Sequence, residues 1–299
     1  MDKDLRLKLA VQKSGRLTDH SLDILARCGL KLSRGKDQLI AHGENLPLDI
    51  LFVRDDDIPD LVQEDVCDLG LVGLNVLEER RLEMLARGAE AKFQILRSLD
   101  FGRCRLSLAV PDGYAWDGLE SLRGKRIATT YPATLARYLA EHAVNAEIVT
   151  LSGAVEIAPR LGRADLICDL VSSGSTLQAN HLREVQTVLE SQVVLIRTPV
   201  KLPVFKEDWI QRLLLRIDGV EQVKESKYIM LHAPRSALPR IRELLPGSEF
   251  PTIIPLEGSV DKVAVHAVCR ENVFWETLES LKSAGASALL VLPVEKMLS

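Results

Sequence analysis

The sequence has little aromatic content, few cysteines and no long hydrophobic run. Phe, Trp and Tyr make up 4% of the 299 residues, whereas hydrophobic residues of all kinds make up 46%, so aliphatic side chains must fill the core. No apolar stretch approaches the roughly 20 residues that a membrane-spanning helix needs. The charged segment 1–5 lacks the apolar centre of a secretory signal. We therefore expect a cytoplasmic protein without a membrane partner.

Five cysteines are present, and no two of them form a Cys-x-x-Cys pair. Cys28, Cys67, Cys104, Cys168 and Cys269 are an odd number, and most lie inside apolar runs. Buried, reduced thiols are therefore expected in place of disulfides or metal ligands.

The chain also lacks an excess of basic charge. Its formal net charge is −4, which gives no reason to expect nucleic acid as a partner. An anionic substrate must then be held by local basic groups and backbone amides. At 299 residues the chain is too long for one ordinary core, and two or three domains are expected.

The most informative stretch is 169–180, a loop rich in small donors. It follows a short apolar run typical of a buried strand and leads into residues with helical spacing. A helix N-terminus offers unpaired N–H groups and a partial positive charge, so the loop is typical of a phosphate cradle. Asp169, just upstream, suits sugar hydroxyls. The loop donors are Ser172, Ser173, Gly174, Ser175 and Thr176.

This loop has an alternative interpretation. It is also consistent with a tight turn in which Ser175 or Thr176 merely caps a helix. The stretch alone leaves both interpretations open.

A second candidate junction lies between a predicted strand over 5–11 and a predicted helix over 18–28. Lys13 and Arg16 bracket Ser14 and Gly15 there. Two cations around Ser-Gly at a strand-to-helix junction favour an anion site over a chance surface charge.

A third junction follows the predicted strand 49–54. Arg54 at the strand tip is a candidate contact for an anion, and Asp55, Asp56 and Asp57 follow it. Three consecutive aspartates are compatible with Mg²⁺. However, Asp before a Pro-started helix more commonly caps that helix and suits its dipole, and we favour this second interpretation.

Strands and helices alternate over 5–182, which predicts an α/β fold with a mostly parallel sheet. Ligands bind such sheets beyond the carboxyl ends of the strands, where all three junctions lie. After residue 225 the pattern becomes strand, helix, strand, strand, helix, strand. This order is typical of a ferredoxin-like domain, for which we expect a regulatory or assembly role.

Several segments resemble the ATP phosphoribosyltransferase family, the first enzyme of histidine biosynthesis, in its long form. The resemblance runs nearly end to end, and the loop 169–180 is its most specific part. The other segments are 12–17, 53–59, 152–156, 225–230 and 274–277.

The resemblance implies two lobes folded like periplasmic binding proteins, with a catalytic cleft between them, and a C-terminal ferredoxin-like (βαββαβ) regulatory domain. It also implies a hexamer built from dimers and feedback inhibition by histidine. On this chain the first lobe is expected over 1–103 and 183–205, the second over 104–182, a linking helix over 206–224 and the regulatory domain over 225–299.

The resemblance also implies roles for individual residues. Asp169 would hold the ribose hydroxyls of phosphoribosyl pyrophosphate, and Ser172, Ser173, Gly174, Ser175 and Thr176 its 5-phosphate. The polyphosphates of the substrates would face Lys13, Gly15, Arg16 and Arg54, with Glu156 a weaker assignment. Asp169 and Arg16 are the expected catalytic residues.

The implied reaction joins the phosphoribosyl group to ring nitrogen 1 of the adenine of ATP and releases pyrophosphate. Mg²⁺ is the implied cofactor, held largely by substrate and water. The sequence departs from the family at Leu74, where Glu is expected, and at Ser175, where a small apolar residue is usual. We assign no role to Leu74.

Two other functions fit parts of the sequence. The same two-lobe architecture serves non-catalytic small-molecule sensors. Another phosphoribosyltransferase, with a different acceptor base, would need the same loop. Only the wider resemblance indicates ATP.

Overall fold

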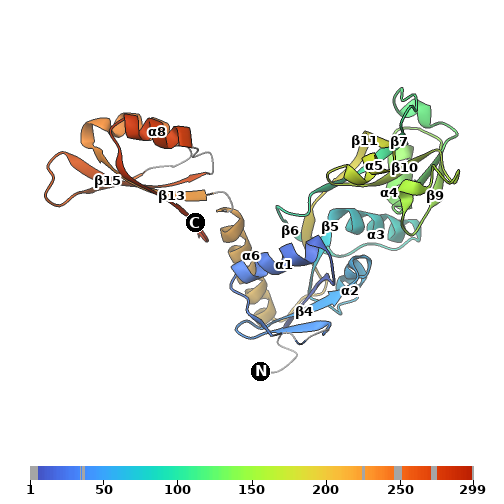
Figure 1. The fold of residues 1–299 in the computed structure, drawn as a ribbon. Helices are drawn as coiled ribbons and strands as arrows, with labels where there is room; N and C mark the ends of the chain where they lie inside the picture. Colours follow the sequence, from blue (N-terminus) through green and yellow to red (C-terminus); the bar gives the residue numbers. More distant parts are fainter. Residues whose placement is uncertain are drawn as a thin grey trace. The chain divides into compact units, whose positions relative to one another are not determined.

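The computed structural model describes residues 6–33, 35, 38–223, 226–245, 251–270 and 275–297. It divides into two compact units, one of Met1–Ala26 with Leu30–Asp208 and one of Arg27–Gly29 with Trp209–Ser299. Within the described residues, the first unit holds two β-sheets and the second holds one (Figure 1). The parts of the first unit built on its two sheets are called the first and second lobes below.

The first lobe is built on a sheet with the strand order β2-β3-β4-β1-β5-β12-β6. Strand β1 is parallel to β4 and to β5, so their carboxyl ends lie at one edge. Gly70 in β5 permits close packing of α2, because a Cβ there would lie 2.7 Å from Cγ2 of Ile58. The elements are β1 (Leu7–Gln12), α1 (Arg16–Arg27), β2 (Leu32–Ser33), β3 (Ile40–Gly43), β4 (Leu48–Val53), η2 (Asp55–Asp57), α2 (Ile58–Gln63), β5 (Leu69–Gly73), α3 (Leu74–Ala86), β6 (Gln94–Ser98) and β12 (Val193–Arg197).

The second lobe is built on a sheet with the strand order β11-β7-β10-β8-β9. Strand β10 is parallel to β8 and antiparallel to β7. The elements are β7 (Cys104–Pro111), η3 (Leu119–Leu122), β8 (Arg126–Thr129), α4 (Pro132–Glu141), β9 (Glu147–Thr150), η4 (Val155–Ile157), β10 (Leu166–Val171), α5 (Ser175–Ala179) and β11 (Leu182–Ser191).

Strand β11 differs from the sequence-based expectation. We expected the first lobe to resume at residue 183, but β11 pairs with β7 in the second sheet. The pairing contains two register shifts, between Glu184 and Gln186 and between Thr187 and Leu189. These irregularities break the two-residue alternation by which a strand is recognised in a sequence.

Both faces of the second sheet are covered by apolar side chains. One core contains Leu108, Leu166 and Cys168, and the other contains Ile167 and Val171. Since successive residues of a strand point to opposite faces, the side chain of Asp169 lies on the face of Ile167 and Val171.

The second unit confirms the predicted ferredoxin-like domain. Its antiparallel sheet has the order β14-β15-β13-β16, and helix α8 lies on one face of it (Figure 1). Helix α6 (Val204–Glu221) begins in the first unit and ends in the second. The other elements are β13 (Ser226–Pro234), η5 (Arg235–Ala237), α7 (Leu238–Leu244), β14 (Thr252–Pro255), β15 (Lys262–Arg270), α8 (Trp275–Ser283) and β16 (Ser287–Pro293).

The cysteines are free thiols, as expected from the sequence. Four of them are buried and Cys104 is half-buried. Burial raises the pKa of the Cys28 and Cys67 thiols to about 11, so both stay protonated at neutral pH. Among the described residues, no helix is both long and apolar enough to cross a membrane.

Candidate functional site

The loop between β10 and α5 presents its hydroxyl groups to solvent. Gly174 occupies the N-cap position of α5 with φ +80°, a left-handed conformation that glycine adopts without strain. Neither Ser175 nor Thr176 makes a cap hydrogen bond through its side chain, so the alternative in which one of them caps this helix is wrong. The hydroxyls of Ser173 and Ser175 instead lie 3.0 Å apart, and both side chains are exposed. Only one of these hydroxyls can donate to the other, so the second remains available to an anion.

Asp169 lies beside this loop on β10 and is half-buried. Its Oδ1 accepts a hydrogen bond of 2.8 Å from the backbone N–H of Leu170. Burial raises the pKa of Asp169 and the nearby Glu156 carboxylate raises it further, while the Leu170 N–H opposes the shift. Two predicted site residues, Asp169 and Glu156, are therefore close neighbours.

A basic residue beneath the loop was not predicted from the sequence. Arg105 of β7 is paired in register with Val171, and its guanidinium forms a two-pronged ion pair with Glu184 of β11 at 2.5 Å. Its Nη1 also lies 3.4 Å from the carbonyl oxygen of Ser172. A sequence signal for this residue would require the antiparallel register of β7 and β10, because Arg105 is far from the loop along the chain.

The candidate residues of the first lobe also lie side by side. The backbone N–H of Lys13 donates to the carbonyl of Val53 at 2.7 Å, which places Lys13 next to Arg54. Both side chains are exposed. Gly15 has φ +114°, and Thr18 closes the turn by donating its hydroxyl to the Gln12 carbonyl at 2.8 Å.

Arg16 begins helix α1, but its side chain lies outside the described part of the structure. Residues 225 and 274, at the edges of two segments in the resemblance, also lie outside the described ranges.

The three aspartates after Arg54 do not cap a helix through their side chains. They form the short turn η2, and neither η2 nor α2 has a side-chain cap hydrogen bond. Our capping interpretation is therefore wrong as to hydrogen bonding, although the charges still suit the dipole of α2. Partial burial, with the neighbouring Asp55 and Asp57 carboxylates, raises the pKa of Asp56.

A cavity of about 540 Å³ lies between the two lobes. Among the described residues, the wall of the cavity contains none of the predicted site residues. One wall residue, Asp55, directly follows Arg54 in the sequence. Acidic side chains dominate the wall. The wall consists of Asp55, Asp56, Asp60, Val76, Glu79, Arg80 and Glu83 from the first lobe, and Thr130, Tyr131, Leu151 and Ser152 from the second.

Tyr131 of the second lobe is linked to the first lobe by a hydrogen bond. Its hydroxyl accepts a hydrogen bond of 2.9 Å from the side-chain amide of Asn75 in α3. Burial raises the pKa of Tyr131, and the carboxylates of Asp55, Asp56 and Asp169 raise it further. Tyr131 thus lies near acidic groups of both lobes, and this juxtaposition could not be inferred from sequence spacing.

Comparison with known families identifies most of the chain. Residues 54–219 match the family model HisG, described as ATP phosphoribosyltransferase. Residues 224–296 match the model of the HisG C-terminal domain. The first model alone covers more than half of the chain.

Solved structures give a consistent result. A chain of the ATP phosphoribosyl transferase (HisG:HisZ) complex from Thermotoga maritima is 27% identical, with a TM-score of 0.57, over 71% of this chain and 98% of that one. The alkanesulfonate-binding protein SsuA from Xanthomonas axonopodis pv. citri is 16% identical, with a TM-score of 0.46, over 74% of this chain and 75% of that one.

The expected architecture, two α/β lobes with a C-terminal βαββαβ domain, is therefore confirmed. The chain belongs to the ATP phosphoribosyltransferase family and is an enzyme that transfers a pentosyl group.

Proposed function

We propose that the protein transfers the phosphoribosyl group of phosphoribosyl pyrophosphate to ring nitrogen 1 of the adenine of ATP. The bond between the anomeric carbon and pyrophosphate breaks, pyrophosphate leaves with the electron pair, and a carbon–nitrogen bond to adenine forms. The observation that carries this proposal is the open loop around Gly174, with its exposed hydroxyls, beside the half-buried carboxylate of Asp169. Phosphoribosyl-ATP made in this way is the product of the first step of histidine biosynthesis.

In this proposal the loop holds the 5-phosphate and Asp169 holds the ribose hydroxyls. Hydroxyl and backbone N–H donors near a helix start suit a phosphate group. A carboxylate beside the ribose both accepts its hydroxyl hydrogens and favours the positive charge that develops at a reacting anomeric carbon. The loop residues are Ser172, Ser173, Gly174, Ser175 and Thr176.

The first lobe would hold the polyphosphates of the substrates. Lys13 and Arg54 lie side by side at the ends of β1 and β4. Gly15 lies between β1 and α1, and α1 begins at Arg16. Positive groups at this position neutralise the pyrophosphate as it leaves. Glu156, which we expected on the ATP side, lies near Asp169, where a carboxylate suits hydroxyl or amino groups better than phosphate.

Mg²⁺ is the cofactor we propose, held mainly by the substrates. Among the described residues, no group of three or more His, Cys, Asp or Glu side chains is arranged to hold a metal ion. Asp55 and Asp56 line the cavity beside Arg54 and fit a site in which one or two carboxylates complete a shell of phosphate oxygens and water. The bound ion supplies neutralisation of the pyrophosphate charge.

Regulation and assembly complete the proposal. We assign histidine binding and feedback inhibition to the C-terminal βαββαβ domain (225–299), and propose a hexamer built from dimers in the cytoplasm. The match to a chain from a HisG:HisZ complex supports assembly with other chains in general terms. We keep 1–103 with 183–205 as the proposed first lobe and 104–182 as the second, except that β11 joins the second lobe. Residues 206–224 link the lobes to the regulatory domain.

The Gly174→Ala variant is expected to raise the KM for phosphoribosyl pyrophosphate about tenfold. A Cβ at this position would meet only Cγ1 of Val171, at 4.0 Å, so space is not limiting. The φ of +80° costs a non-glycine residue about 1 kcal/mol or more, and relief of that strain moves the loop amides. Gly113→Ala is the matched control, since Gly113 has φ +82° in an open turn away from this loop; an equal KM rise there would remove the loop-specific explanation.

A pyrophosphate-release assay with ATP, phosphoribosyl pyrophosphate and Mg²⁺ tests the reaction directly. We expect release that depends on both substrates and that falls when histidine is added. Release with another base in place of ATP, and none with ATP, would identify a different phosphoribosyltransferase. Binding of the substrates without turnover would favour the sensor alternative.

A further inference from the structure

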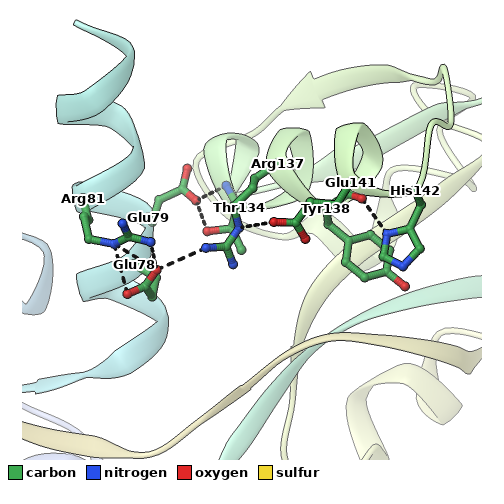
Figure 2. A network of polar contacts seen from close by, with 8 residues as sticks. All are labelled: Glu78, Glu79, Arg81, Thr134, Arg137, Tyr138, Glu141 and His142. Carbon is green, nitrogen blue, oxygen red and sulfur yellow. Dashed lines mark hydrogen bonds and ion pairs between the residues drawn. The ribbon is translucent and has the colours of Figure 1, made fainter. Parts of the chain in front are cut away.

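Helix α3 of the first lobe contacts the start of helix α4 of the second through a buried carboxylate (Figure 2). Glu79 is 8% exposed. It accepts hydrogen bonds from the backbone N–H of Ala133 at 2.7 Å, from that of Thr134 at 2.8 Å and from the Thr134 hydroxyl at 2.6 Å. All three donors belong to the first turn of α4.

Glu79 thus takes the place of a helix cap. Helix α4 has Pro132 in its first turn and no side-chain cap of its own. A carboxylate at a helix N-terminus satisfies unpaired N–H groups and interacts favourably with the helix dipole. Because the group is buried, leaving it unpaired would be costly, so the pairing holds the two helices together.

A second buried contact strengthens this junction. Asn75, one turn before Glu79 on α3, donates to the hydroxyl of Tyr131 and accepts a hydrogen bond of 2.8 Å from the hydroxyl of Ser191. The ion pair of Glu78 with Arg137, at 3.3 Å, also crosses between the helices but is more exposed (Figure 2). Solvent screens this partly buried pair more than it screens the contacts of Glu79, so the junction depends chiefly on Glu79 and Asn75.

The junction determines where one wall of the cavity lies. Thr130 and Tyr131 line the cavity and directly precede α4. The first lobe holds the start of α4 through Glu79, so it also fixes Tyr131 opposite Asp55 and Asp56. The reaction proposed above requires groups of both lobes to hold the two substrates at a fixed distance from each other.

We propose that Glu79 is a positioning residue, which aligns the two lobes so that the acceptor base reaches the anomeric carbon. This inference rests on the proposed function. Glu79 touches neither the phosphate loop nor the Lys13 region, so the groups proposed to bind the substrates remain in place within each lobe when Glu79 is altered. Misalignment then slows the reaction of the bound pair.

The test is a kinetic comparison of Glu79→Gln with the parent enzyme. We expect kcat to fall about tenfold to a hundredfold while the KM for ATP changes less than threefold. Glu120→Gln removes the same charge from an exposed position of the second lobe, where Glu120 pairs only with Arg123 three residues away, and should change kcat less than twofold. A folded Glu79→Gln enzyme with parental kcat, or one that loses substrate binding in proportion to kcat, would overturn the proposal.

Two further measurements test whether Glu79 holds α4, even if the Glu79→Gln variant is unstable or inactive. Thr134→Val retains the carboxylate and removes one donor, and it should lower kcat in the same direction by a smaller factor. Hydrogen exchange at the amides of Ala133 and Thr134 should be faster in Glu79→Gln than in the parent. An unchanged exchange rate would show that Glu79 does not hold α4. Absence of pyrophosphate release by the parent enzyme would instead refute the proposed reaction, and the exchange result would still stand.

Discussion

The Asp169→Asn variant is expected to keep its fold and to lose roughly a hundredfold to a thousandfold in kcat, the usual size of a single electrostatic contribution to a transition state. Asn retains an oxygen that can accept the Leu170 N–H, as Oδ1 of Asp169 does at 2.8 Å. It loses the negative charge that holds the ribose and favours positive charge at its reacting carbon. Steady-state pyrophosphate release, with circular dichroism as a check on folding, measures both effects.

The stability of Asp169→Asn relative to the parent is expected to depend on pH. The folded-state pKa of Asp169 is raised, mainly by burial, so the charged carboxylate opposes folding and its cost appears as pH rises through that pKa. Asp169→Asn should therefore be at least as stable as the parent at neutral pH, with the advantage shrinking in acid. Urea unfolding at pH 4 and pH 7 tests this sign.

Asp165→Asn provides the matched control. Asp165 lies just before β10, and the Arg126 guanidinium holds the pKa of that carboxyl below its usual range. The charge of Asp165 stabilises the fold at neutral pH, and this contribution disappears in acid. Asp165→Asn should therefore be less stable than the parent at neutral pH, with a smaller difference in acid, while kcat changes less than twofold. If both variants lost activity equally, or if Asp169→Asn turned over at the parental rate, the role assigned to Asp169 would be wrong.

The Asp68→Ala variant should lose about 3–5 kcal/mol of unfolding free energy, the usual cost of breaking a buried ion pair. Asp68 is 5% exposed, and its carboxylate accepts bonds of 2.8 and 3.0 Å from Nζ of Lys206 and of 2.8 Å from the Lys8 backbone N–H. Truncation leaves the mostly buried ammonium group without its counter-charge. Urea unfolding followed by circular dichroism measures the loss.

A double variant separates pairing from packing. Lys206→Met in the Asp68→Ala background removes the uncompensated ammonium, so it should recover part of the lost stability and give a non-additive cycle. A loss below 1 kcal/mol for Asp68→Ala, or strict additivity, would show that the pair does not anchor the start of α6.

The carboxyl-end loops of β1, β4 and β10 were predictable because a strand, a helix and their junction each leave a local pattern in the sequence. The order of elements after residue 225 predicted the ferredoxin-like domain for the same reason. Strand β11 was placed in the wrong lobe, since its two register shifts disrupt the alternating pattern.

The contacts between the lobes were not predictable from local patterns. Arg105 lies under the phosphate loop only because β7 pairs with β10. Tyr131 and Glu79 enter the cavity through the packing of α3 against α4. Nothing in the spacing of these residues indicates that they meet, and a buried Glu in an otherwise amphipathic helix is usually read as an exposed charge.

A crystal structure of the protein with phosphoribosyl pyrophosphate and Mg²⁺ tests the assignment of the loop most directly. The 5-phosphate should contact the amides and hydroxyls around Gly174, and the ribose hydroxyls should bond to Asp169. Clear density for the ligand elsewhere, with this loop unchanged and in contact only with solvent, would contradict the proposed substrate site.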